Sequence, residues 1–171
     1  MQPVAFDTVA ALTEYGTSLV ATLRDRIKTM PVTRFGPANN TGALAASLRV
    51  EVLTTATGYS LLLYAASYAL ALEYGRRPGK FPPLLAIRQW IESRGIVPHP
   101  DARGRAVSVN TLAFLIGRKI ATAGTVLYQS GQPSGLFSGA MGPEVVAAAL
   151  AALLLPVVVT GLRTALRPAA A

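Results

Sequence analysis

The sequence contains one cluster of residues whose types and spacing could do chemistry, a run of cations between positions 76 and 105. Seven basic residues fall within thirty positions, with few acids among them: Arg76, Arg77, Lys80, Arg88, Arg94, Arg103 and Arg105. Cations without a base-reading motif suit phosphate contacts that ignore sequence. They equally suit a solubilising surface or salt bridges between subunits. We take five as candidate contacts with DNA or a neighbouring subunit: Arg76, Arg77, Lys80, Arg103 and Arg105.

The stretch 75–81, GRRPGKF, has the composition of a phosphate-binding loop. Its glycine-to-lysine spacing is one residue short, and Phe81 stands where a Ser or Thr must bind magnesium. Pro78 also lacks one of the backbone N–H groups that cradle phosphate in such a loop. These departures argue against nucleotide binding and favour a basic loop that faces solvent or a partner.

The other titratable residues do not form a catalytic or metal-binding pattern. His99 is the only histidine, and Asp101 is too close to it in sequence for the usual Ser-His-Asp arrangement. The chain has no cysteine, and its eight acids are dispersed. Glu73 lies just ahead of the basic loop, where we expect a salt bridge to Arg76 or Arg77. We predict a protein that is not an enzyme and that needs no metal or cofactor.

The composition indicates a folded chain with little polar surface. Of 171 residues, 51% are hydrophobic and only 14% charged, yet the net charge is +8. The apolar fraction excludes an intrinsically disordered chain. So few charges, mostly positive, suggest a surface that is covered by partners or lies against something anionic.

Residues 145–162 lack charge and reach the lower length limit for a membrane span. Pro156 and the high alanine content weaken that interpretation. We predict a helix covered by the core or by the assembly, and we keep a tail-anchored membrane protein as an alternative.

The elements that must position the cations follow from hydrophobic periodicity. An N-terminal helix over 7–28, capped by Asp7, carries one apolar stripe: Leu12, Tyr15, Leu19, Leu23 and Ile27. Alternating residues predict a β-hairpin over about 45–64, with a turn at 54–58, a more buried second strand and further strands beside it. Short helices are expected over 66–74, from Pro83 to 95 with Leu84 buried, and from Ser108 or Asn110 to Gly124. An Ala-rich helix follows Pro143.

These elements predict an α+β fold in which a small antiparallel sheet packs with helices. We expect a single structural domain over 1–171. Its parts are an N-terminal helix and linker (1–35), a core (40–130), and a connector with a C-terminal helix (131–171).

The order of several short motifs resembles that of one protein family. TGALAASLRV (41–50) resembles the family's "TGxLxxSl" motif before the first strand, and YAASYALALEYG (64–75) its "YAxYxExG" helix. RRPGKFPP (76–83) resembles the proline-rich loop that follows. IRQWI and GI (87–96), then LAFLIGRKI and GT (112–125), are similar to one subgroup. The family is that of neck or tail-completion (minor tail) proteins of tailed bacteriophages, and the resemblance covers about residues 8–130.

The resemblance implies a virion structural protein in the neck or tail, made in the host cytoplasm. Its copies would form a homo-oligomeric ring that joins the capsid portal or adaptor to tail-tube or tail-terminator proteins, with genomic DNA possible in the lumen. Segments 41–50 and 73–83 would supply scaffold and subunit contacts. The uncharged C-terminal segment departs from the family pattern. A non-specific DNA-binding module remains a further alternative.

Overall fold

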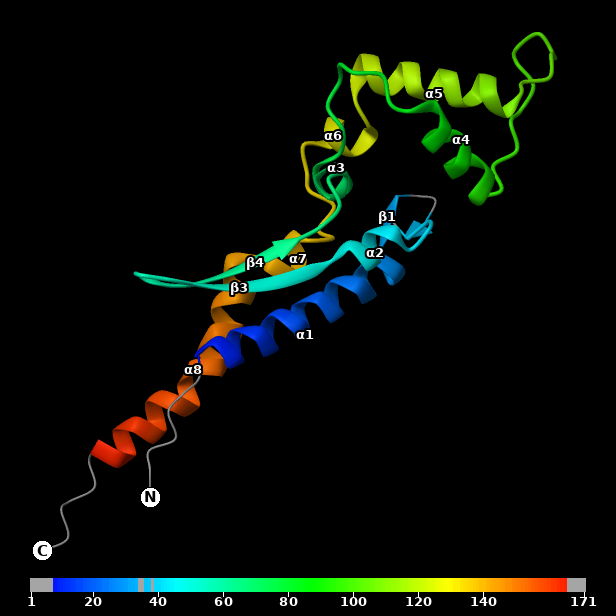
Figure 1. The fold of residues 1–171 in the computed structure, drawn as a ribbon. Helices are drawn as coiled ribbons and strands as arrows, with labels where there is room; N and C mark the ends of the chain where they lie inside the picture. Colours follow the sequence, from blue (N-terminus) through cyan, green and yellow to red (C-terminus); the bar gives the residue numbers. More distant parts are fainter. Residues whose placement is uncertain (1–7, 34–35, 38, 166–171) are drawn as a thin grey trace, which may run out of the picture.

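Helix α1 (Thr8–Thr29) forms one side of the fold in the computed structural model, which describes residues 8–33, 36–37 and 39–165 (Figure 1). The predicted apolar stripe is confirmed, because Leu19, Leu23 and Ile27 are buried while Leu12 and Tyr15 are half-buried. The expected cap at Asp7 lies outside the described residues. The helix ends two residues before Pro31, in agreement with proline's exclusion from helix interiors.

The predicted hairpin is present as β3 (Arg49–Thr55) and β4 (Gly58–Tyr64), which pair antiparallel around a two-residue turn. It lies against α1, where Gly16 permits a close approach. A Cβ at Gly16 would come within 2.9 Å of the Leu61 Cδ1 atom. The second strand is the more buried of the two, as predicted, because four of its seven residues are half-buried against two of seven in the first.

The further strands form a separate pair and do not widen the hairpin. They are β1 (Pro31–Thr33) and β2 (Gly36–Pro37), followed by the short helix α2 (Ala43–Ser47). The fold is therefore α+β, with two small antiparallel two-stranded sheets among helices. A two-stranded sheet needs packing on one face to be stable, and for β3–β4 helix α1 supplies it.

The larger of two hydrophobic clusters joins α1, α2, α3 (Ala69–Tyr74) and α7 (Ser138–Met141), with Leu23, Ile27, Leu48 and Leu136 almost fully buried. The chain between α6 (Val126–Ser130) and α7 is fixed to this cluster from two sides. The Arg26 guanidinium donates to the carbonyls of Gly135 at 2.6 Å and Leu136 at 3.1 Å. The Glu73 carboxylate, on α3, accepts hydrogen bonds from the same segment.

Glu73 does not pair with Arg76 or Arg77, so that expectation is wrong. Its buried carboxylate accepts hydrogen bonds from the backbone N–H groups of Phe137 (2.8 Å) and Ser138 (3.1 Å) and from the Ser134 hydroxyl (3.0 Å). The physical reason is that α3 points this side chain at the 134–138 segment, whose N–H groups have no helical partner. Burial raises the pKa of Glu73, but these hydrogen bonds outweigh it and hold the pKa below its ordinary value.

The smaller cluster lies between α4 (Leu84–Ser93) and α5 (Val109–Ala123), around Ile87, Ile91 and Ala113. Ser108 caps α5 by accepting from the Thr111 N–H, as its sequence position predicts. Leu84 is exposed at 43%, so its predicted burial is wrong. It occupies the first position of α4, on the same face as Ile87 and Ile91 but at the end of the helix, and it is not part of their cluster. We call residues 76–125, which contain this helix pair and its loops, the α4–α5 module.

Helix α8 (Pro143–Ala165) leaves the body at the end opposite the α4–α5 module and runs away from it (Figure 1). It carries Leu155 and Val159 with exposed fractions of 59% and 40%. Among the described residues, no helix is long and apolar enough to cross a membrane.

Candidate interaction surfaces

Positive charge is concentrated in the α4–α5 module. Residues 76–125 contain nine Lys and Arg against two acids, a net charge of +7, whereas the rest of the chain has seven cations against six acids. The module stands at one end of the elongated molecule (Figure 1). One end of the protein is therefore strongly basic, while the body and α8 are almost neutral.

The structure divides the five predicted contact residues between the two ends of α5. Arg76, Arg77 and Lys80 lie at its C-terminal end, where the Gly79 N–H donates to the Ala121 carbonyl at 2.8 Å. Arg103 and Arg105 lie in the loop that precedes its N-terminus. A helix of fifteen residues is about 22 Å long. The predicted patch is therefore two patches.

The patch at the N-terminal end of α5 is partly neutralised. Asp101 accepts hydrogen bonds from the backbone N–H groups of Arg103 and Arg105, both at 2.9 Å, and forms a salt bridge with the Arg105 guanidinium at 2.6 Å. The hydrogen bonds from Arg105, more than that from Arg103, lower the pKa of this carboxyl group below its usual value. Arg105 therefore stabilises its own loop.

The patch at the C-terminal end of α5 gains two cations that the sequence analysis missed, Arg118 and Lys119. They join Arg77 and Lys80 on exposed positions. Residues 102–143 contain no acid, and within the described part of the chain none of these four cations has an ion pair. We call Arg77, Lys80, Arg118 and Lys119 the basic patch. Helical spacing alone could not find it, because only the fold brings the 76–80 loop to the end of α5, where the Gly79 N–H donates to the Ala121 carbonyl.

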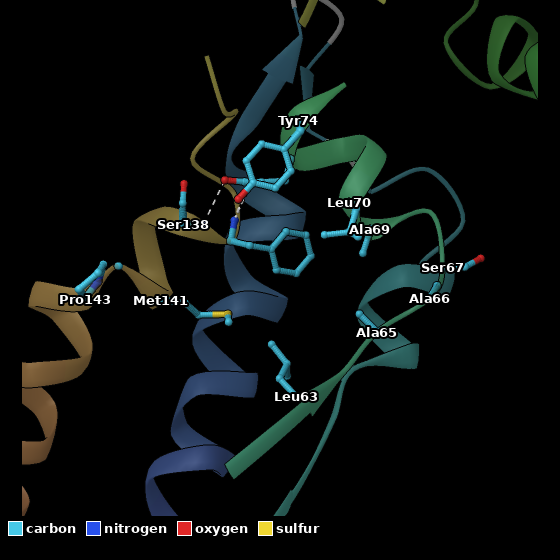
Figure 2. A pocket seen from close by; sticks show the side chains of 13 residues that line it. Leu63, Ala65, Ala66, Ser67, Ala69, Leu70, Tyr74, Ser138, Met141 and Pro143 are labelled. Carbon is cyan, nitrogen blue, oxygen red and sulfur yellow. Dashed lines mark hydrogen bonds between the residues drawn. The ribbon is translucent and has the colours of Figure 1, made fainter. Parts of the chain in front are cut away.

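A groove of about 580 Å³ lies between α3, the end of β4 and α7 (Figure 2). Its walls are mostly apolar and include Leu63, Leu70, Phe137 and Met141. Leu70 and Tyr74 stand at its edge with exposed fractions of 69% and 56%. Helix α3 therefore has an apolar face toward solvent as well as one toward the core.

A second groove of about 430 Å³ adjoins the first and shares Leu63 and Met141 with it. It lies between α1, β4 and the first turns of α8, whose Val146 and Leu150 line it. We call the two together the apolar groove. No sequence pattern predicted this groove. The available signal was the pair Leu70 and Tyr74, which lie four residues apart on one face of α3, beside the face that carries the core-facing Ala69.

The described residues contain no group of three or more His, Asp or Glu side chains placed to hold a metal ion. No family model, no curated protein and no solved structure matches the chain.

Proposed function

We propose that the protein is a non-enzymatic structural subunit that works in an oligomeric ring, as a tail-completion or head-to-tail connector protein of a tailed bacteriophage. One observation carries the proposal. The described residues form an elongated molecule in which the α4–α5 module and helix α8 project at opposite ends of the body (Figure 1). A shape with two projecting ends is expected of a subunit whose surface is completed by its neighbours.

The type of exposed surface supports the same proposal. Many large apolar side chains are exposed on separate elements, among them Leu53 on the hairpin, Leu70 on α3 and Leu155 on α8. A ring subunit has neighbours on both sides and layers above and below it. Contacts of this kind cover apolar surface and leave little room for charge, in agreement with a charged fraction of only 14%.

The basic patch supports an anionic partner at the end of the molecule that carries the α4–α5 module, away from helix α8. In a connector, that partner is an acidic face of a portal, adaptor or tail protein, or genomic DNA in the lumen. The proposed position in the neck or tail rests on the resemblance of residues 8–130 to the tail-completion family. The charge distribution and the exposed apolar side chains indicate only that the subunit assembles with partners.

The test is the oligomeric state of the purified full chain, measured by sedimentation velocity and negative-stain microscopy. We expect closed, symmetric particles. A variant with Val97→Ser, which removes an exposed apolar side chain in the loop before α5 and outside the apolar groove, should form the same particles. A strictly monomeric chain at high concentration, with no affinity for portal or tail-tube protein, would refute the proposal.

A second candidate function is non-specific DNA binding, and the charge distribution favours it. A net charge of +7 on fifty residues, with four unpaired exposed cations near one helix end, suits contacts with phosphates. Its signature is an affinity for DNA that falls steeply with salt and does not depend on sequence.

A further inference from the structure

Two apolar side chains in the second half of α8, Leu155 and Val159, are exposed. From Val145 to Leu162 the helix has no charged residue. A helix that is apolar all round is buried in a functional protein. The first turns of α8 contact the apolar groove through Val146 and Leu150, but Leu155 and Val159 lie beyond it, exposed. The helix therefore requires an apolar partner surface outside its own chain.

The apolar groove is a surface of the matching kind. Its α3 side is apolar and open, with Leu70 and Tyr74 exposed, and the only acid in its lining, Glu73, is buried and hydrogen-bonded. A helix without charges can enter such a groove without removing a charge from water, which would cost several kcal/mol. The helix of the same chain cannot fill the α3 side, because it starts at Pro143 and runs in the other direction (Figure 1).

We propose that α8 of one copy packs into the apolar groove of a neighbouring copy, against α3 and α7. This inference rests on the proposed ring and names its contact. A standard interface covers about 800 Å² on each partner. A ring subunit with two such interfaces therefore covers about 1,600 Å² of its surface. The head-to-tail arrangement, with a helix on one side and a groove on the other, generates a ring when its rotation closes.

The absence of cysteine from the chain permits a direct test by cross-linking. One copy carries Leu70→Cys or Tyr74→Cys, and a second copy with a different tag carries Leu155→Cys or Val159→Cys. The two are co-expressed as full chains and treated with a short, flexible bismaleimide. We expect a heterodimeric product from at least one of the four pairs. Val126→Cys, at an exposed position of α6 outside the groove, replaces the groove variant as the matched control and should give none.

A second measurement does not depend on cross-linking geometry. Leu155→Asp together with Val159→Asp should weaken self-association at least tenfold in sedimentation velocity. Both side chains are exposed in the single chain, so the thermal midpoint of the monomer should not change.

The possible outcomes separate the inference from the proposed function. Oligomers without a heterodimeric product from any pair, and unaffected by the double substitution, would overturn the inference and leave the ring in place. A strictly monomeric full chain would overturn both. A chain that is recovered on phosphatidylcholine vesicles through residues 143–171, and is a soluble monomer without them, would overturn the inference in favour of membrane anchoring.

Discussion

Arg76 and Thr125 exchange two hydrogen bonds across forty-nine positions of sequence. The Arg76 N–H donates to the Thr125 hydroxyl oxygen, and the Thr125 N–H donates to the Arg76 carbonyl, both at 2.9 Å. Each residue follows a glycine, and the two glycines have the same backbone conformation, with φ near +76° and ψ near 180° at Gly75 and Gly124. Only glycine adopts this region readily. The α4–α5 module thus begins and ends at one paired junction.

Replacing Gly75 with alanine should destabilise the protein by about 3 kcal/mol or more. The added Cβ would lie 2.3 Å from the backbone nitrogen of Tyr128, so the α6 segment would have to move. The control is Gly131→Ala, which also has a positive φ but open space around it, and which should cost about 1 kcal/mol. Urea denaturation measures both. Equal losses in the two variants would contradict the close approach at this junction.

Glu73→Gln should lower the free energy of unfolding by about 2 kcal/mol. Phe137 and Ser138 donate to different carboxylate oxygens, so the amide keeps an acceptor for one of them and directs its own N–H groups at the other donor. Glu92→Gln is the matched control, because its salt bridge to Arg88 is exposed and its loss should cost less than about 0.5 kcal/mol. If Glu73→Gln proved as stable as the wild type in urea, the idea that the Glu73 carboxylate fixes residues 134–138 by hydrogen bonds would be refuted.

The contribution of Glu73 to stability should disappear at acid pH. Its pKa in the folded state is below the ordinary value of 4.5, so the unfolded state takes up the proton first as the pH falls. The stabilisation is complete above pH 4.5 and is lost as the pH falls below it and through the folded-state pKa. We therefore expect the urea midpoints of wild type and Glu73→Gln to converge between pH 6 and pH 3. A constant difference would show that the carboxylate charge is not responsible.

The basic patch makes a quantitative prediction for the DNA-binding candidate. If all four cations contact phosphates, the logarithm of affinity for duplex DNA falls with the logarithm of salt concentration with a slope of about −3.6. Lys80→Gln with Lys119→Gln should halve this slope, as measured by fluorescence anisotropy. Lys28→Gln, an exposed lysine on α1, should leave it unchanged. Undetectable DNA binding, or a slope that the double substitution does not alter, would exclude DNA as the partner.

Local patterns predicted most helices and the hairpin, because caps, prolines and periodicity act within a few residues. Ser108 and Gly124 bound α5 as expected, and the alternation of Val50 and Val52 predicted β3. The contacts that build the surfaces were beyond such patterns. Glu73 has its partners about sixty residues away, and Gly79 contacts α5 only after the chain has folded back. The function that the resemblance to tail-completion proteins implies stays a prediction, which the experiments above test.

The junction between Arg76 and Thr125 has a consequence for how this protein can vary. The α4–α5 module leaves the body and returns to it at the same place, so its fifty residues form a cassette inserted at a single point. Segments of this kind can be exchanged or shortened while the rest of the chain still folds, because both attachment points remain side by side. The cassette also holds nearly all of the net charge. Replacing it would give the same assembling body a different charged partner.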